Sequence, residues 1–126
     1  MNIVLWILQV LLAALFLFHG YIMVFPPAAL IETMNQVYST SFRLFVGISE
    51  SLGAIGLLLP GITRILPRLT SWAGIGLMIV AASASVFHFS RGETSSAIIT
   101  AVLFVLLAFV SYMRWKVKPI ASQKAT

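Results

Sequence analysis

The stretch Ile3–Val24, IVLWILQVLLAALFLFHGYIMV, contains no Lys, Arg, Asp or Glu. Three further apolar stretches follow it, at Phe42–Leu59, Leu69–Phe89 and Ala97–Met113. Each has the roughly 17 to 25 residues that an α-helix needs to cross a bilayer. Lipid offers backbone groups no hydrogen-bond partner, and these runs are continuous rather than alternating. They therefore predict four transmembrane helices, at about 3–24, 42–59, 69–89 and 97–113.

The composition agrees with a membrane protein. Of 126 residues, 60% are hydrophobic and 9% are charged, with a mean hydropathy of +1.05. Soluble domains have roughly 45 to 50% apolar and 25% charged residues. So few charged side chains could not cover the surface in water, which excludes a soluble enzyme or a nucleic-acid-binding domain. The absence of cysteine excludes disulfides, thiolate metal sites and thiol redox pairs.

The connections between the four stretches predict the topology. They are short, which favours an all-α, antiparallel up-down four-helix bundle that forms one membrane domain over residues 1–126. The first connection begins with Pro26-Pro27 and continues with an amphipathic pattern, so we expect a short helix on the outer surface. Pro60 and Gly61 are expected to end the second transmembrane helix, and Pro67 to precede the third.

Basic residues predict the orientation. Six lie on the side that holds both termini and two on the other side; the six are Arg64, Arg68, Arg114, Lys116, Lys118 and Lys124, and the two are Arg43 and Arg91. Because basic residues favour the cytoplasmic side, we expect both termini in the cytoplasm and residues 114–126 to form a cytoplasmic basic tail. The bias explains the net charge of +5 without a nucleic-acid partner.

Ionisable residues at membrane depth are costly and mark candidate sites. Glu50 lies near the middle of the second stretch, while His19 and His88 lie in the outer halves of the first and third. Helical spacing places Glu50 on one stripe with other second-helix residues, and small residues on this stripe favour close packing. The stripe consists of Arg43, Gly47, Glu50, Ala54 and Leu57. We expect Glu50 and His88 to share the bundle interior, and Arg43 to snorkel or to meet an anionic headgroup or ligand.

These residues and nearby aromatics make up the candidate ligand-binding set: Glu50, His88, His19, Arg43, Phe45 and Tyr21. An aromatic-rich cavity with a few polar groups is typical of small-molecule sites. The alternative is a structural role, in which Glu50 hydrogen-bonds to His19, His88, Ser49 or Ser85 and only stabilises the bundle. No Glu-x-x-His or His-x-x-x-His pair is present, so no metal site is predicted.

Three motifs together resemble the DoxX-like family of small four-helix membrane proteins. They are GISESLGAIGLLLP at 47–60 with LT at 69–70, ASVFH at 84–88, and RGE at 91–93. The resemblance covers nearly the whole chain and singles out Glu50 and His88, with Gly47, Gly53 and Gly56 as packing residues. It implies a bacterial cytoplasmic-membrane protein, in a family named for a subunit of a quinone-linked thiosulfate oxidoreductase. Other relatives are implicated in redox-stress complexes or in assembling membrane receptors.

The leading hypothesis is a bundle that holds a quinone-like or lipid-like ligand in its outer half and serves a membrane oxidoreductase. We expect no intrinsic cofactor and no independent catalytic activity, with the lipid bilayer, an oxidoreductase subunit or further copies of the chain as partners. The alternative is a non-enzymatic assembly or chaperone-type subunit in which Glu50 is structural. A proton-coupled transporter is a third hypothesis, but four helices without an inverted repeat offer little machinery for alternating access.

Overall fold

The computed structural model describes residues 1–122, and in this range every regular element is a helix. These are α1 (Asn2–Val24), α2 (Ala28–Val37), α3 (Thr40–Thr63), α4 (Leu69–Ser90), α5 (Thr94–Tyr112) and the π-helical turn η1 (Met113–Val117). Within the described range, α1, α3, α4 and the continuous helix Thr94–Val117 are long and apolar enough to span a membrane. The predicted all-α, multi-pass membrane fold is therefore confirmed. Lys124, assigned to the basic tail, lies outside the described residues.

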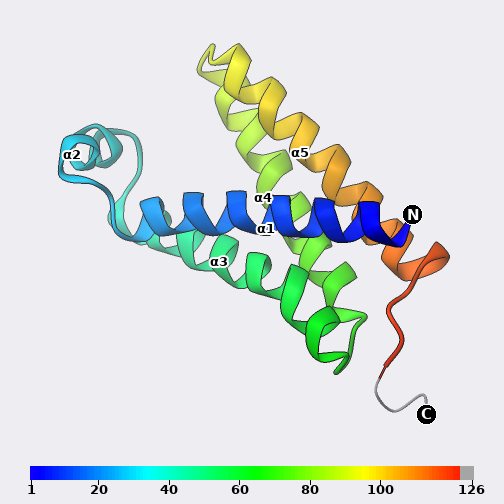
Figure 1. The fold of residues 1–126 in the computed structure, drawn as a ribbon. Helices are drawn as coiled ribbons and strands as arrows, with labels where there is room; N and C mark the ends of the chain where they lie inside the picture. Colours follow the sequence, from blue (N-terminus) through cyan, green and yellow to red (C-terminus); the bar gives the residue numbers. More distant parts are fainter. Residues whose placement is uncertain (123–126) are drawn as a thin grey trace.

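The helices form two antiparallel pairs that cross each other (Figure 1). One pair is α1 with α3, the other is α4 with α5, and α3 packs against α4 where the pairs meet. The N-terminus and the C-terminal segment lie at the same end of the bundle, where Arg64, Arg68, Lys116 and Lys118 also gather; we call this the basic end. The opposite end, which carries α2 and the turn between α4 and α5, is the α2 end.

Two helices continue about one turn beyond their predicted C-terminal ends. Pro60 and Gly61 do not end α3, which continues to Thr63 and stops at Arg64 in the left-handed conformation (φ 58°). Both residues are buried, and Gly61 lies against the Trp6 ring, so packing outweighs the backbone hydrogen bond that proline removes. The boundary at residue 113 is also wrong, because helical structure continues as η1 to Val117.

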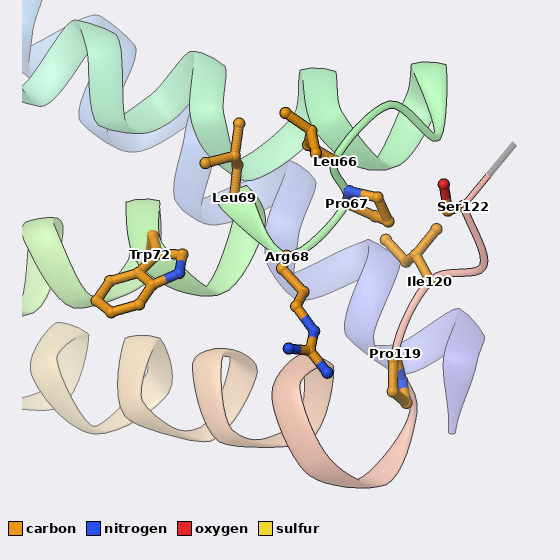
Figure 2. Close-up of a pocket in the computed structure, with 8 residues that line it drawn as sticks. All are labelled: Leu66, Pro67, Arg68, Leu69, Trp72, Pro119, Ile120 and Ser122. Atoms are coloured by element: carbon orange, nitrogen blue, oxygen red, sulfur yellow. The ribbon is translucent and has the colours of Figure 1, made fainter. Parts of the chain in front are cut away.

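The C-terminal segment folds back onto the turn between α3 and α4. Figure 2 shows Pro119 and Ile120 of this segment facing Pro67 of the turn. The Arg64 Nε donates a hydrogen bond to the Ala121 carbonyl oxygen at 2.8 Å, which ties the segment to the end of α3. Residues 118–122 are therefore placed against the basic end rather than extended away from it.

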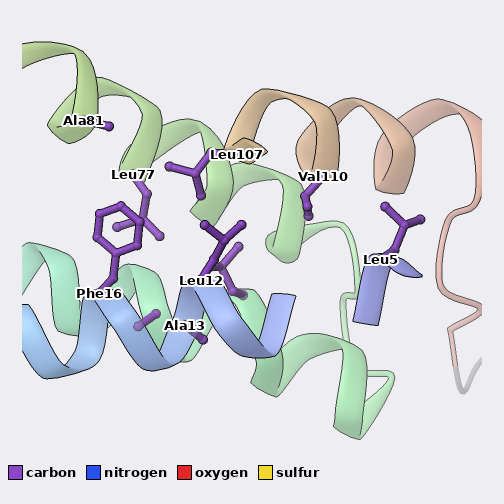
Figure 3. Close-up of a cluster of buried hydrophobic side chains, with 10 residues drawn as sticks. Leu5, Leu12, Ala13, Phe16, Leu77, Ala81, Leu107 and Val110 are labelled. Carbon is purple, nitrogen blue, oxygen red and sulfur yellow. The ribbon is translucent and has the colours of Figure 1, made fainter. Parts of the chain in front are cut away.

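The core lies where the two pairs cross. Figure 3 shows large aliphatic side chains and one aromatic ring meeting there, contributed by α1, α4 and α5. The buried apolar residues of this core are Leu5, Leu12, Ala13, Phe16, Ala54, Leu57, Leu77, Ala81, Leu107 and Val110. The predicted stripe on α3 is confirmed, since all five of its residues are buried. Most other large apolar side chains are exposed, as expected for a surface in contact with lipid.

Candidate functional site

The site begins with a close approach of two backbones. A Cβ built on Gly20 of α1 would lie 2.8 Å from the Gly47 carbonyl oxygen, and one built on Gly47 would lie 2.9 Å from the Gly20 carbonyl oxygen. Real Cβ atoms do not come this near to backbone. Glycine at both positions therefore lets α1 and α3 touch, as small residues do at membrane helix interfaces. We call the interface along Arg43, Gly47 and Glu50 of α3, with His19 and Gly20 of α1, the α1–α3 seam.

The seam brings a histidine and a glutamate together. The His19 Nδ1 lies 2.5 Å from the Glu50 Oε2, a hydrogen bond between side chains 31 residues apart. His19 directly precedes Gly20, so the contact between the Gly20 and Gly47 backbones determines how close the imidazole lies to α3. The Glu50 side chain is only 5% exposed, whereas the His19 side chain is 55% exposed on the outside of the bundle. The pair thus joins a buried carboxyl group to the surface that lipid would cover.

Arg43 has a different environment from the one predicted. It neither snorkels nor points outward: it is 6% exposed, and its Nη1 donates to the Met23 carbonyl oxygen at 2.5 Å and to the Val24 carbonyl oxygen at 3.4 Å. The last carbonyl groups of a helix have no partner within it, and a cation there also favours the helix dipole. Arg43 therefore satisfies the end of α1 and fixes it against α3.

His88 does not bond to Glu50. Its Nδ1 lies 2.9 Å from the Glu93 Oε1 in the turn between α4 and α5, and the Arg91 Nε lies 3.5 Å from the same oxygen. The His88 hydrogen bond lowers the pKa of the Glu93 carboxyl below its ordinary value, and Arg91 acts in the same direction. The structure thus has two His–Glu pairs, one in the seam and one at the turn.

The two aromatic candidates face outward. Phe45 is 70% exposed and Tyr21 is 61% exposed, so neither covers Glu50. Two grooves, of about 350 and 390 Å³, lie at the basic end, and none of the six candidate residues lines them. Of the candidate set, the structure brings together His19 and Glu50, with Arg43 further along the same seam. Among residues 1–122, no three His, Asp or Glu side chains are placed to hold a metal ion.

Sequence reasoning missed a second polar cluster, near the basic end. Gln9 of α1 is fully buried: its Nε2 donates to the Leu57 carbonyl oxygen at 2.7 Å, and its Oε1 accepts from the Arg114 Nε at 2.6 Å. The Arg114 Nη1 also donates to the Asn2 Oδ1 at 2.6 Å. Arg114, assigned to the cytoplasmic tail, is only 3% exposed. A single amide inside an apolar α1 was the available signal, since such a group needs a partner in the membrane.

Comparison with known proteins gives one family. The DoxX-like family matches residues 7–110, a range that includes most of α1, all of α2, α3 and α4, and most of α5. Both residues of the His19–Glu50 pair and both residues of the His88–Glu93 pair fall inside it. The comparisons with curated proteins and with solved structures gave no significant match.

Proposed function

We propose a ligand-binding role for this chain, which belongs to the DoxX-like family and is an integral membrane protein with four spanning helices. The ligand is a small apolar molecule with a polar head, quinone-like or lipid-like, that reaches the α1–α3 seam from the bilayer. The protein lies in the bacterial cytoplasmic membrane with both termini in the cytoplasm, so the seam is in the outer half. It presents the ligand to a membrane oxidoreductase.

The observation that carries this proposal is the unequal exposure of the His19–Glu50 pair. An imidazole is costly on a lipid-facing surface unless both of its nitrogens find partners. The His19 Nδ1 is hydrogen-bonded to Glu50. Nε2, on the opposite side of the ring, is therefore available to a group outside the bundle. A carbonyl or hydroxyl oxygen fits this position, because neutral imidazole donates through one nitrogen and accepts through the other.

The surroundings of His19 favour an apolar ligand body. Leu15 and Ile22, four residues before and three after His19, lie on the same face of α1, and Leu15 is 46% exposed. A ligand held at Nε2 would therefore lie along an aliphatic surface that is open to lipid. This arrangement suits a molecule that diffuses within the bilayer better than one that arrives from water.

The pair can also move a proton. When His19 Nε2 takes a proton from a hydroxyl group, Nδ1 can release its own proton to the Glu50 carboxylate, and the reverse sequence returns it. A quinone-like headgroup would supply the oxygen that gains or loses this proton. Glu50 is the proton store, and its burial keeps it from exchanging directly with water. We assign electron transfer to the partner.

Extraction of the protein from its own membrane tests this proposal. We expect wild-type protein in mild detergent to carry a quinone or lipid that mass spectrometry detects, and His19→Phe to lose most of it. His88→Gln is the matched control, because it removes the other His–Glu pair and should retain the ligand. Equal amounts of ligand in all three proteins, or none in wild type, would contradict the proposal. A stoichiometric protein partner on ligand-free wild type would instead favour the assembly subunit.

A further inference from the structure

The basic end carries two grooves that meet at one tryptophan. The first is lined by the α3–α4 turn, the start of α4 and the C-terminal segment, including Leu66, Arg68 and Ile120 (Figure 2). The second runs between α4 and α5 and includes Ile75 and Met78. Trp72 lines both, and the volumes of about 350 and 390 Å³ are in the range of roughly 300 to 1,000 Å³ of small-molecule sites.

Basic side chains stand where the grooves meet. The Arg68 guanidinium carbon lies 4.7 Å from the centre of the Trp115 ring, and Trp115 in turn packs edge-on against Trp72 at 5.8 Å. The second groove is lined by Lys116 as well as by Trp72 and Trp115. Two cations are therefore held next to two indole rings, which favour the interface between lipid and water.

No acidic side chain lies near these cations. The three acidic residues of the chain are Glu32, Glu50 and Glu93, which lie in α2, in the middle of α3 and in the turn of the α2 end. Arg68 and Lys116 are exposed. An anionic ligand would thus meet uncompensated positive charge beside an apolar surface.

We propose that this surface is a binding site for an anionic phospholipid of the bilayer. Its phosphate lies at Arg68 and Lys116, near Trp72, and its acyl chains lie along the second groove, between α4 and α5, toward the membrane interior. Basic pockets between membrane helices on the cytoplasmic side are suited to acidic headgroups. The occupant is a bilayer lipid because the cations and the apolar groove between α4 and α5 meet at Trp72, so one molecule with a charged head and an apolar body contacts both.

Brominated lipids test the site directly, since bromine on an acyl chain quenches nearby tryptophan. Protein is reconstituted in vesicles that contain brominated phosphatidylglycerol or brominated phosphatidylcholine at equal mole fraction, and a Trp6→Phe background leaves Trp72 and Trp115 as reporters. We expect stronger quenching by the anionic lipid. Arg68→Gln and Lys116→Gln should each reduce its relative affinity by about fivefold, the effect of one basic residue near an anionic lipid surface.

The control separates a site from general surface charge. The single variants Arg91→Gln and Lys118→Gln each remove one positive charge, as Arg68→Gln and Lys116→Gln do, but neither residue lines a groove. In these control variants the preference for the anionic lipid should therefore persist. The proposal would be overturned if the control variants lost the preference for the anionic lipid to the same extent as the Arg68 and Lys116 variants. Equal quenching of the wild-type protein by the two lipids would also overturn it.

Discussion

Arg114 donates its Nε hydrogen to the Oε1 of Gln9, across a 2.6 Å contact between residues 105 positions apart in the chain. The bond joins η1, which continues α5, to α1. The second hydrogen bond of Gln9, to the Leu57 carbonyl oxygen, joins α1 to α3. The two pairs of helices are thus connected by one buried amide as well as by the apolar core. This contact closes the bundle at the basic end, where α1 and α5 meet.

We predict that Gln9→Leu destabilises the protein by about 1–3 kcal/mol, because it strands buried hydrogen-bond groups of Arg114 and Leu57. Combining it with Arg114→Met removes the stranded charge, so the double variant should be more stable than Gln9→Leu alone. Melting temperatures in detergent provide the measurement. A double variant whose melting temperature falls below that of wild type by the sum of the two single effects would show that the two side chains are not coupled.

The glycine contact in the seam makes a second prediction. Gly20→Ala and Gly47→Ala place a methyl group against backbone oxygen, so each should cost about 1–3 kcal/mol, as overpacking does. Gly76→Ala is the matched control on α4, because a Cβ there meets nothing within 4 Å. It should be neutral or stabilise by up to about 1 kcal/mol through helix propensity. Thermal unfolding that ranks Gly76→Ala with the other two variants would contradict the observed packing.

Gly53, which faces α4, should respond less strongly than the glycines of the seam. A Cβ on Gly53 would meet the side chain of Leu77, whereas one on Gly56 would meet the Cβ of Ala73, which is fixed to the backbone. A leucine side chain can shift whereas a backbone carbonyl cannot, so Gly53→Ala should cost less than Gly47→Ala. The same thermal unfolding series ranks these variants.

The lowered pKa of the Glu93 carboxyl predicts that the stability of the protein depends on pH. This pKa is lowered in the folded protein, chiefly by the His88 hydrogen bond, from an ordinary value of 4.5. A group with a depressed folded pKa stabilises the protein above its unfolded pKa, and this contribution is lost as the pH falls through the folded pKa. Wild type should therefore have a higher melting temperature than Glu93→Gln near neutral pH, and the difference should disappear as the pH falls through the lowered pKa of Glu93. A difference that grows on acidification would contradict the assignment, and Glu32→Gln controls for charge at the α2 end.

Much of the fold could be predicted because few physical constraints decide it. Long, continuous apolar runs with few charges favour helices in lipid, and short connections favour antiparallel neighbours. The α3 stripe from Arg43 to Leu57 was predictable because helical spacing alone sets which residues share a face. The amphipathic helix after Pro27 is confirmed as α2 for the same reason.

The partners of the polar groups could not be predicted in the same way. Spacing placed Glu50 and His88 toward one interior, but it did not show that the closer partner of His88 is Glu93 in the following turn. Arg43 appeared to be an interfacial cation because the free carbonyl groups at the end of α1 belong to a different helix. Arg114 was assigned to the tail since no local signal in the sequence shows that Gln9 accepts from it.

The proposed orientation predicts the accessibility of single cysteines. Cysteines at Ser39 and Ser95, at the α2 end, should react with a membrane-impermeant maleimide added to intact cells. A cysteine at Ser122, at the basic end, should react only after the membrane is opened. The reverse pattern would place the His19–Glu50 pair in the inner half of the membrane.

The central claim is that His19 and Glu50 bind a ligand from the bilayer, and ligand-induced stabilisation measures it most directly. A short-chain benzoquinone should raise the melting temperature of ligand-free wild type, because a ligand that binds only the folded state stabilises it. Glu50→Gln preserves the size and hydrogen-bonding capacity of the side chain, so its melting temperature without ligand should change little. The benzoquinone should nevertheless raise it much less than that of wild type, while His88→Gln should respond as wild type does. No rise in wild type, or an equal rise in all three proteins, would contradict the account.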